Sequence, residues 1–366
     1  MKKRLLALLL AGAMCFSLAA CGNDTGDTTS KPPEDTSSNP PESGNGDDAE
    51  LTINDVWPSG TTVYIDVPAK AGGGTDIATR YLTQALGEVV PGVNFVVNNY
   101  DTTEVGREHM KNADPNGQTL LVHHGGMILE YFSGTTNVSA KDDYKTVGVV
   151  NRGGPQAIIT RPDAPYKTLE ELGSYINEHP NEVVIGCTLG GASQAALFAI
   201  IDALGEGYTE KVNWVQCGSE ADKLTQTASG SIDIANCSVN NAQSYEADGR
   251  LNIICTSCPT GTTLAQLSEL VGLELGKNYA PCPEQGVDAV YDSSYYVWAP
   301  AGTPDNICEA INAVVMKASE QQSFIDGMKQ MACFVEADDY ATTQQIFNDE
   351  WTAMEALAEG MGIKTR

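Results

Sequence analysis

The chain has 366 residues and a formal net charge of −27, because 48 Asp and Glu outnumber 21 Lys and Arg. This acid excess, without a visible basic patch, argues against a nucleic-acid-binding protein. Once residues 1–58 are set aside for the reasons given below, about 300 residues remain, which is enough for two domains of ordinary size. Solubility of an exported protein explains most of the acidity.

The N-terminus has the pattern of a bacterial export signal. Lys2, Lys3 and Arg4 precede an apolar run at residues 5–20, which is too short for a lasting membrane span. The Leu-Ala-Ala-Cys sequence that ends at Cys21 is similar to a bacterial lipobox. It predicts removal of residues 1–20 as a signal peptide and attachment of an acyl lipid such as palmitate to the Cys21 thiol. Ordinary cleavage that leaves a free N-terminal cysteine is the alternative.

A polar segment follows the predicted lipidation site. Residues 21–58 are mostly Asp, Thr, Ser, Pro, Gly and Asn, with almost nothing apolar. Such a segment cannot bury enough surface to fold. We therefore expect a disordered acidic tether that holds the folded part outside the cell, anchored to the membrane rather than spanning it.

The folded part is expected to begin with a strand, a glycine turn and a helix. Residues 62–67 favour a strand, and the apolar residues of 77–86 recur at helical spacing. The turn between them, residues 68–76, contains three consecutive glycines and ends in Thr75 and Asp76, either of which can cap the helix. Its backbone N–H groups and the helix N-terminus suit an anion without a cationic side chain. The spacing fits neither a P-loop nor a dinucleotide fingerprint, so a turn without a ligand is the alternative.

Further strands at 93–97 and 119–122, with a helix at 104–112 between them, indicate an α/β sheet. In such sheets, ligands lie beyond the carboxyl ends of strands, where His123 and His124 follow the second of these strands. Neighbouring residues on an extended chain point to opposite sides, so one histidine is expected to face the ligand. We assign His123 as this hydrogen-bond donor, with a packed or exposed histidine as the alternative.

A second glycine turn, at residues 186–193, follows a short strand at 183–185 and precedes a helix at 194–204. That helix is apolar nearly all round and is therefore predicted to be buried. Two such turns on separate lobes can face each other across a cleft and hold the two ends of one small anion. Residues 215–220 form a third turn between a strand and a helix.

Other elements are predicted from the same signals. Strand-like runs occupy 144–150, 157–160, 231–235 and 295–300, a capping box opens a helix at 168, and helices are expected at 305–318 and 342–360. The last helix is expected to pack on the first lobe.

Eight cysteines follow Cys21. Outside the cell, an even number suggests disulfides, whereas reduced thiols packed as small core residues are the alternative. Cys255 and Cys258 have the spacing of a redox pair or of half a metal site, but no second pair or histidine-rich partner follows. We expect no metal and no cofactor.

Five motifs in register carry a resemblance to a known family. Each is weak alone, but together they resemble the tripartite tricarboxylate transporter receptors, also called the Bug family of extracytoplasmic solute-binding proteins, over about residues 60–365. The motifs are Pro-Ala-Lys-Ala-Gly-Gly-Gly-Thr-Asp at 68–76, Asp-Pro-Asn-Gly-Gln-Thr-Leu-Leu at 114–121, Lys-Thr-Leu-Glu-Glu-Leu at 167–172, Gly-Cys-Thr-Leu-Gly-Gly-Ala-Ser at 186–193 and Ala-Pro-Ala-Gly-Thr-Pro at 299–304.

The resemblance implies a two-lobed α/β fold of the periplasmic-binding-protein type (type II) with a central ligand cleft. Lobe 1 would comprise residues 59–155 plus 293–366, and lobe 2 residues 156–292. The implied function is capture of a small carboxylate, of the di- or tricarboxylate class, and its delivery to a tripartite tricarboxylate-type membrane permease. We expect a monomer.

The resemblance also implies ligand contacts at the first and second glycine turns, to which we add His123 and the third turn. The expected residues are Ala69, Lys70, Gly72, Gly73, Gly74, Thr75, Asp76, His123, Thr188, Gly190, Ser193 and Gly218. Two departures leave the ligand's identity open: Ala69 stands where the family usually has an aromatic residue, and residues 98–103 replace a glycine-rich loop. Lys70 is either a carboxylate partner or a solvent-facing lysine.

Two other classes stay open. An exported hydrolase needs a nucleophile, a base and an orienting acid, yet the chain has four histidines and no Gly-x-Ser-x-Gly elbow. An adhesion or scaffold lipoprotein would bind no small solute, and only the tether and the cysteines of lobe 2 favour it. Binding without catalysis is therefore the expected function. Aromatic acids, amino acids and citrate-like acids all suit two helix ends.

Overall fold

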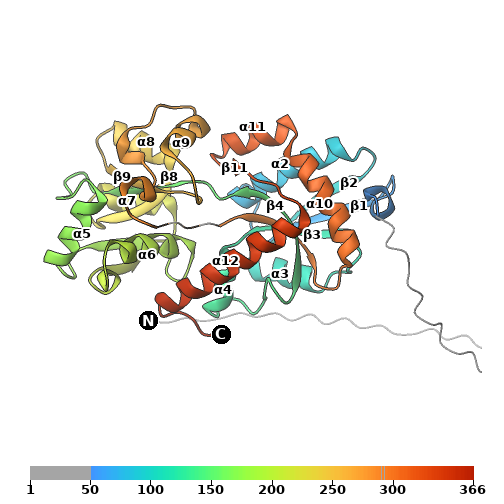
Figure 1. Ribbon diagram of the computed structural model, residues 1–366, viewed down its shortest axis with the longest axis horizontal. Helices are drawn as coiled ribbons and strands as arrows, with labels where there is room; N and C mark the ends of the chain where they lie inside the picture. The colour runs from blue at the N-terminus through green and yellow to red at the C-terminus, as the bar shows by residue number, and fades with distance from the viewer. Residues whose placement is uncertain (1–50, 290, 292) are drawn as a thin grey trace, which may run out of the picture. The chain divides into compact units, whose positions relative to one another are not determined.

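The strands of the chain form two mixed β-sheets, which a computed structural model describes over residues 51–289, 291 and 293–366 (Figure 1). The expected signal peptide, Cys21 and most of the expected tether lie outside the described residues. Sheet A has the strand order β11-β4-β10-β3-β1-β2, and sheet B has the order β7-β6-β8-β5-β9. Both sheets belong to one compact unit that extends to Arg366.

Sheet A is assembled from two separate parts of the chain. Strands β1 and β3 are parallel, as are β1 and β2, whereas β10 runs antiparallel between β3 and β4. The strands are β1 (Thr62–Val67), β2 (Asn94–Asn99), β3 (Thr119–His124), β4 (Tyr144–Arg152), β10 (Tyr295–Pro300) and β11 (Phe334–Val335). The chain therefore leaves sheet A after β4 and returns to it at β10.

Sheet B is built from the segment between those two strands. Strand β6 is parallel to β7 and β8, and β5 is antiparallel to β8 and β9. The strands are β5 (Gln156–Thr160), β6 (Val184–Cys187), β7 (Asn213–Gln216), β8 (Ile234–Ser238) and β9 (Asn252–Ser257). This composition is compatible with the lobe boundaries expected from the sequence, which stay a prediction.

Helices surround both sheets, so the mixed α/β class is confirmed. The helices are α1 (Ile53–Val56), α2 (Gly74–Val89), α3 (Thr103–Lys111), α4 (Gly126–Phe132), α5 (Leu169–Glu178), α6 (Ala192–Leu204), α7 (Glu220–Ala228), α8 (Val239–Ala247), α9 (Leu264–Val271), α10 (Asp305–Ser319), α11 (Gln322–Gln330) and α12 (Tyr340–Gly360). Short 3-10 turns lie at Tyr208–Glu210, Lys277–Tyr279 and Cys282–Gln285. None of the helices in these described ranges combines the length and apolar character that a membrane crossing requires.

Both faces of sheet A carry a hydrophobic cluster, and successive side chains of β10 point alternately into one cluster and the other. Val297 packs into a cluster that includes Leu82 of α2 and Ile311 of α10. Trp298 points to the other side, where it joins a cluster with Trp351 of α12. The predicted packing of the C-terminal helix on this sheet is therefore confirmed, and Figure 1 shows α12 running beside α4.

The folded part begins before residue 58, which the composition had predicted to be the last residue of the tether. Trp57 is fully buried, and its Nε1 donates a hydrogen bond to the carbonyl oxygen of Gly117 at 2.8 Å. Its ring meets Phe95 edge-on, with centroids 5.6 Å apart. Ile53 and Val56 also pack against this core. A few apolar residues at the end of a polar segment were enough to anchor it.

The eight cysteines of the described chain are free thiols, and all of them are buried. This is the arrangement expected of the reduced-core alternative rather than of a disulfide framework. The closest approach is between Cys255 and Cys282, whose Sγ atoms are 3.5 Å apart. Burial raises the pKa of the Cys255 thiol well above its usual value, which favours the unreactive protonated form.

Candidate functional site

A cavity of about 240 Å³ lies where residues from both sheets meet the start of α6. Sheet A contributes His124 at the end of β3 and Tyr295 at the start of β10. Ser193 of α6, Lys223 of α7 and Asn236 of β8 come from the sheet B side. Segments far apart in the sequence thus converge on one small polar space, as in ligand pockets generally.

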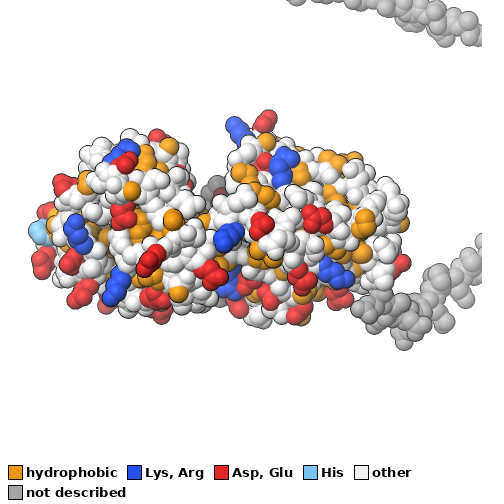
Figure 2. All heavy atoms as spheres, turned by 90° about the horizontal axis from the view of Figure 1, so that it is seen from above, with side chains coloured by type: hydrophobic (Ala, Val, Ile, Leu, Met, Phe, Trp, Pro, Cys, Tyr) orange, Lys and Arg blue, Asp and Glu red, His pale blue; other side chains and the backbone are white. Residues whose placement is uncertain are grey.

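The charge of this cavity is opposite to that of the chain. Among the described residues that line it, none is Asp or Glu, and Lys223 is the one Lys or Arg. The chain as a whole carries −27, and Figure 2 shows Asp and Glu side chains distributed widely over one face of the molecule. A cavity whose described lining residues include no carboxylate is suited to an anion in so acidic a chain.

Lys223 is held under the start of α6 by two hydrogen bonds. Its Nζ donates to Ser193 Oγ at 2.6 Å and to Asn236 Oδ1 at 2.9 Å, and Ser193 Oγ donates to the same Asn236 oxygen at 2.9 Å. The residue is only 7% exposed. Burial lowers the pKa of the Lys223 ammonium, and nearby thiols and Glu220 oppose that shift.

The local sequence explains why the start of α6 faces the cavity. Gly190 has φ +72°, a left-handed conformation that favours glycine, and Gly191 is the N-cap of the helix. The backbone N–H groups of Ala192 and Ser193, in the first turn, have no acceptor among the described residues. They add two donors and the positive end of the helix dipole to the wall.

His124 is a hydrogen-bond donor that sheet A contributes to the cavity. The backbone N–H of Gly126 donates to its Nδ1 at 3.1 Å, so the neutral ring carries its proton on Nε2. Burial lowers the pKa of His124 and keeps the ring neutral near pH 7. The Tyr295 ring lies beside it, with centroids 5.8 Å apart, and offers a hydroxyl group.

Tyr295 connects the cavity to the first glycine turn. A Cβ atom at Gly74 would lie 3.9 Å from the Tyr295 hydroxyl oxygen. Burial raises the pKa of Tyr295, and a hydrogen bond from the Thr75 side chain opposes that shift. Within the turn, Gly72 N–H donates to Asp76 Oδ2 at 2.8 Å, and Arg80 pairs with the same carboxylate at 2.9 Å. One donor of the expected anion site is therefore already engaged by the chain itself.

The structure distributes the other expected site residues unevenly. Of the twelve, Ser193 lines the cavity, while Gly74 and Thr75 adjoin it through Tyr295. Thr188 Oγ1 donates to the Gly218 carbonyl at 3.4 Å, beside the ends of β6 and β7. Outside the lining set are Ala69, Lys70, Gly72, Gly73, Asp76, His123, Thr188, Gly190 and Gly218, and the Lys70 side chain is exposed.

His123 points away from the cavity, and His124 takes the place expected for it. The two neighbours do face different surroundings, as the alternation of an extended chain requires. His123 Nε2 accepts from Arg107 at 3.0 Å, and Arg107 is paired with Glu130 at 2.6 Å. His123 is therefore part of the packed interior, which was the alternative.

The buried neutral His123 should make stability depend on pH. Its pKa is held well below the usual 6.5, chiefly by burial and also by His124 and Arg107. The unfolded chain then binds the extra proton first, so stability falls as the pH drops through about 6.5. Between pH 7.5 and 5.5, the wild type should lose roughly 1 kcal/mol more than His123→Gln in denaturant unfolding. The exposed His179→Gln is the control, and equal losses in all three proteins would contradict the assignment.

Several lining residues were missed by the sequence analysis. Lys223 lies on the buried face of α7, next to Leu224 and four residues before Thr227, which are both buried. A lysine at helical spacing from these inward-facing residues was the signal that could have identified it. Asn236 and Tyr295 lie within apolar strands and gave no local signal. Their importance arises only from the packing of β8 and β10 against distant segments.

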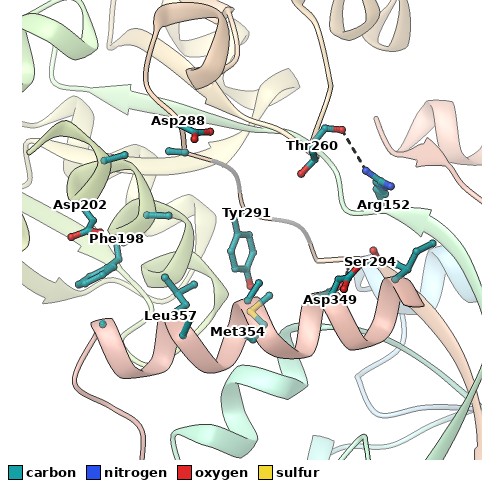
Figure 3. Close-up of a pocket in the computed structure, with 18 residues that line it drawn as sticks. Arg152, Phe198, Asp202, Thr260, Asp288, Tyr291, Ser294, Asp349, Met354 and Leu357 are labelled. Carbon is teal, nitrogen blue, oxygen red and sulfur yellow. Dashed lines mark hydrogen bonds between the residues drawn. The ribbon is translucent and has the colours of Figure 1, made fainter. Parts of the chain in front are cut away.

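A larger cavity of about 860 Å³ lies between α6 and α12 (Figure 3). Figure 3 shows Asp202, Asp288 and Asp349 around it, together with Arg152, whose Nη1 donates to the Thr260 carbonyl at 3.4 Å. Glu350 is a fourth acid in its wall. Volume favours this cavity, but its acidic lining disfavours a carboxylate. We therefore take the smaller cavity as the candidate site.

Comparison with solved structures identifies the architecture. A TctC solute binding protein from Polaromonas matches with a TM-score of 0.67 at 21% identity, covering 83% of this chain and 99% of that one. MatC from Rhodopseudomonas palustris with bound malate gives 0.61 at 20% identity (81% and 98% covered). Rpa4515 from R. palustris with adipate gives 0.65 at 21% identity (84% and 99% covered). The two sheets and their helices thus have the fold of periplasmic solute-binding proteins.

The family follows from the sequence itself. The model of the tripartite tricarboxylate transporter family receptor, TctC, matches residues 82–363. The chain belongs to this receptor family, and the resemblance seen in its five motifs is confirmed.

Proposed function

We propose that the chain is an extracytoplasmic solute-binding lipoprotein that captures a small carboxylate of the di- or tricarboxylate class. The observation that carries the proposal is the cavity wall at the start of α6, which has one ammonium group, helix N–H groups and no carboxylate among its described lining residues. Such a wall has donors for every oxygen of a carboxylate. Two relatives of the same fold hold the dicarboxylates malate and adipate.

Capture requires a change of state as well as a binding wall. The candidate cavity is lined from both sheets, and the chain passes between the sheets at residues 152–156 and again before β10. Rotation about these segments would open and close the cavity. A ligand that touches both sides binds the closed state more tightly and so shifts the population toward it. The closed, loaded form would then be the one recognised by a tripartite tricarboxylate-type permease.

The N-terminal signals support a location of this receptor at the cell surface. Export by residues 1–20 and lipid attachment to Cys21 would anchor the chain to the outer side of the cell membrane. The acidic segment after Cys21 would give the folded part the reach to dock on a membrane partner. We propose a monomer that acts by binding alone.

A serine hydrolase is the second candidate, because Ser193 Oγ lies 2.6 Å from Lys223 Nζ. A serine–lysine pair needs a lysine that accepts the serine proton. Here, Asn236 Oδ1 accepts from both side chains, so Lys223 is placed as a donor and not as a base. Ester hydrolysis by the purified chain that disappears in Ser193→Ala would favour this candidate over a receptor.

Thermal unfolding of the purified chain with a panel of carboxylates tests the proposed function. The panel contains succinate, malate, adipate and citrate, each compared with its fully amidated form. Ligand at a hundred times its dissociation constant should stabilise the chain by about 2.7 kcal/mol. That corresponds to a rise of several degrees with at least one acid and none with its amide. If no acid raises the unfolding temperature, the proposal fails.

A further inference from the structure

We propose that Lys223, presented by Ser193 and Asn236, is the anchor for one carboxylate group of the ligand, and that it sets the requirement for a negative charge. This inference rests on the proposed function and adds to it the residue that recognises the negative charge of the ligand. It differs from the expectation drawn from the first glycine turn, whose backbone N–H groups and helix N-terminus suit an anion without a cationic side chain.

Lys223 is a buried cation with an unfilled donor. An ammonium group has three N–H donors, and Lys223 uses two of them, on Ser193 and Asn236. Both acceptors are neutral, and Lys223 forms no ion pair with any carboxylate among residues 51–289, 291 and 293–366. The remaining donor is available to the cavity that Lys223 lines.

A comparison with Arg107 shows how unusual it is for a buried cation to have no ion-pair partner. Arg107 is the other Lys or Arg in the described part of the chain that is almost fully buried, at 2% exposure, and Glu130 neutralises it at 2.6 Å. A buried charge is costly unless an opposite charge accompanies it. Lys223 has a place for such a partner, because its cavity is open to a small molecule. A carboxylate of the ligand would complete the ion pair that the chain leaves unmade.

The neighbours of Lys223 fit the shape of a carboxylate group. Asn236 turns its Oδ1 toward Lys223, so its amide Nδ2 carries two donors with no acceptor among the described residues. The free N–H groups of Ala192 and Ser193 lie at the same wall. A carboxylate on Lys223 can thus share its two oxygens between the ammonium and these neutral donors. The first glycine turn is less available, because Asp76 already occupies Gly72 N–H.

The test is calorimetric titration of the purified chain and its variants with succinate and adipate, each compared with its uncharged diamide. Lys223→Met removes the charge and keeps the length of the side chain. Lys277→Met removes an equal charge at an exposed position of the same region and is the matched control. Lys223→Gln keeps a neutral donor for Ser193 and Asn236, and it replaces the Met variant if thermal unfolding shows that the Met variant is unfolded.

The anchor predicts that Lys223→Met or Lys223→Gln binds the diacid about 30- to 100-fold more weakly, whereas Lys277→Met stays within about threefold of the wild type. If Lys223 binds the charge of the ligand, the substitution of Lys223 and the removal of that charge should have non-additive effects on affinity. The wild type should discriminate between diacid and diamide at least about tenfold more strongly than the Lys223 variant, which a merely structural role would not produce.

The outcomes separate the two proposals. If the wild type binds neither diacid nor any acid of the thermal panel, the proposed function fails. If the wild type binds a diacid and the Lys223 variants bind it equally well, or lose affinity equally for diacid and diamide, the receptor stands and the anchor is overturned.

Discussion

Replacing Ser193 with Asp should weaken carboxylate binding strongly without destabilising the fold. Ser193 Oγ lies 2.6 Å from Lys223 Nζ, so the new carboxylate would pair with the ammonium and occupy the place of the ligand. Truncating one partner of a buried charge pair costs about 2–5 kcal/mol, so capture of Lys223 by Asp should weaken binding by at least about 30-fold. Calorimetric titration measures the affinity, and thermal unfolding should give a midpoint at or above that of the ligand-free wild type.

Ser193→Asn provides the matched comparison, because its side chain has the size of Asp without the charge. Its loss of affinity should be clearly smaller than that of Ser193→Asp. Equal losses would mean that bulk rather than charge blocks the site. Affinity that is unchanged in both variants would remove Ser193 from the binding wall.

Replacing Trp57 with Ala should destabilise the protein strongly, although the composition around it resembles a linker. The side chain is fully buried, packs on Phe95 and donates to the Gly117 carbonyl. Removing a buried Trp costs about 3–5 kcal/mol, which lowers the unfolding midpoint by roughly 5–10 °C in a chain of this size. A form that begins at residue 59 should show the same loss.

Leu273→Ala is the control for this prediction, because Leu273 is 52% exposed. Its substitution should change stability by no more than about 0.5 kcal/mol. If Trp57→Ala unfolds at the same temperature as Leu273→Ala, the segment before residue 58 contributes nothing to the folded core.

Local patterns in the sequence predicted most of the individual elements. The run at 62–67 became β1 with the same limits, and Thr168 is the N-cap of its helix, with its Oγ1 accepting from Glu171 N at 3.2 Å. Only this half of the predicted capping box forms, because the Glu171 carboxylate accepts from Lys167 N–H at 2.6 Å instead. Helix α2 begins at Gly74 with Gly73 as its N-cap, so the expectation that Thr75 or Asp76 caps it is wrong, because both lie inside its first turn. The features that were predicted correctly depend on residues close in sequence, so periodicity and capping rules were sufficient for them.

The assembly of the elements could not be predicted in the same way. Nothing local indicates that β10 inserts antiparallel between β3 and β4, which lie far earlier in the chain. Patterns in a single sequence do not reveal pairing between such distant strands. The same limit applies to the site. The glycine turn before α6 was visible, but Lys223, Asn236 and Tyr295 meet Ser193 only through the folding of α7, β8 and β10. The choice between His123 and His124 depended on Arg107, which lies on another element.

A structure of the purified chain in complex with the dicarboxylate that stabilises it most is the most direct test of the central claim. The account predicts that the ligand lies in the cavity between His124 and the start of α6, with one carboxylate within hydrogen-bond distance of Lys223 Nζ. A ligand bound in the acidic cavity beside α12, or anywhere outside the cavity that Lys223 lines, would contradict it.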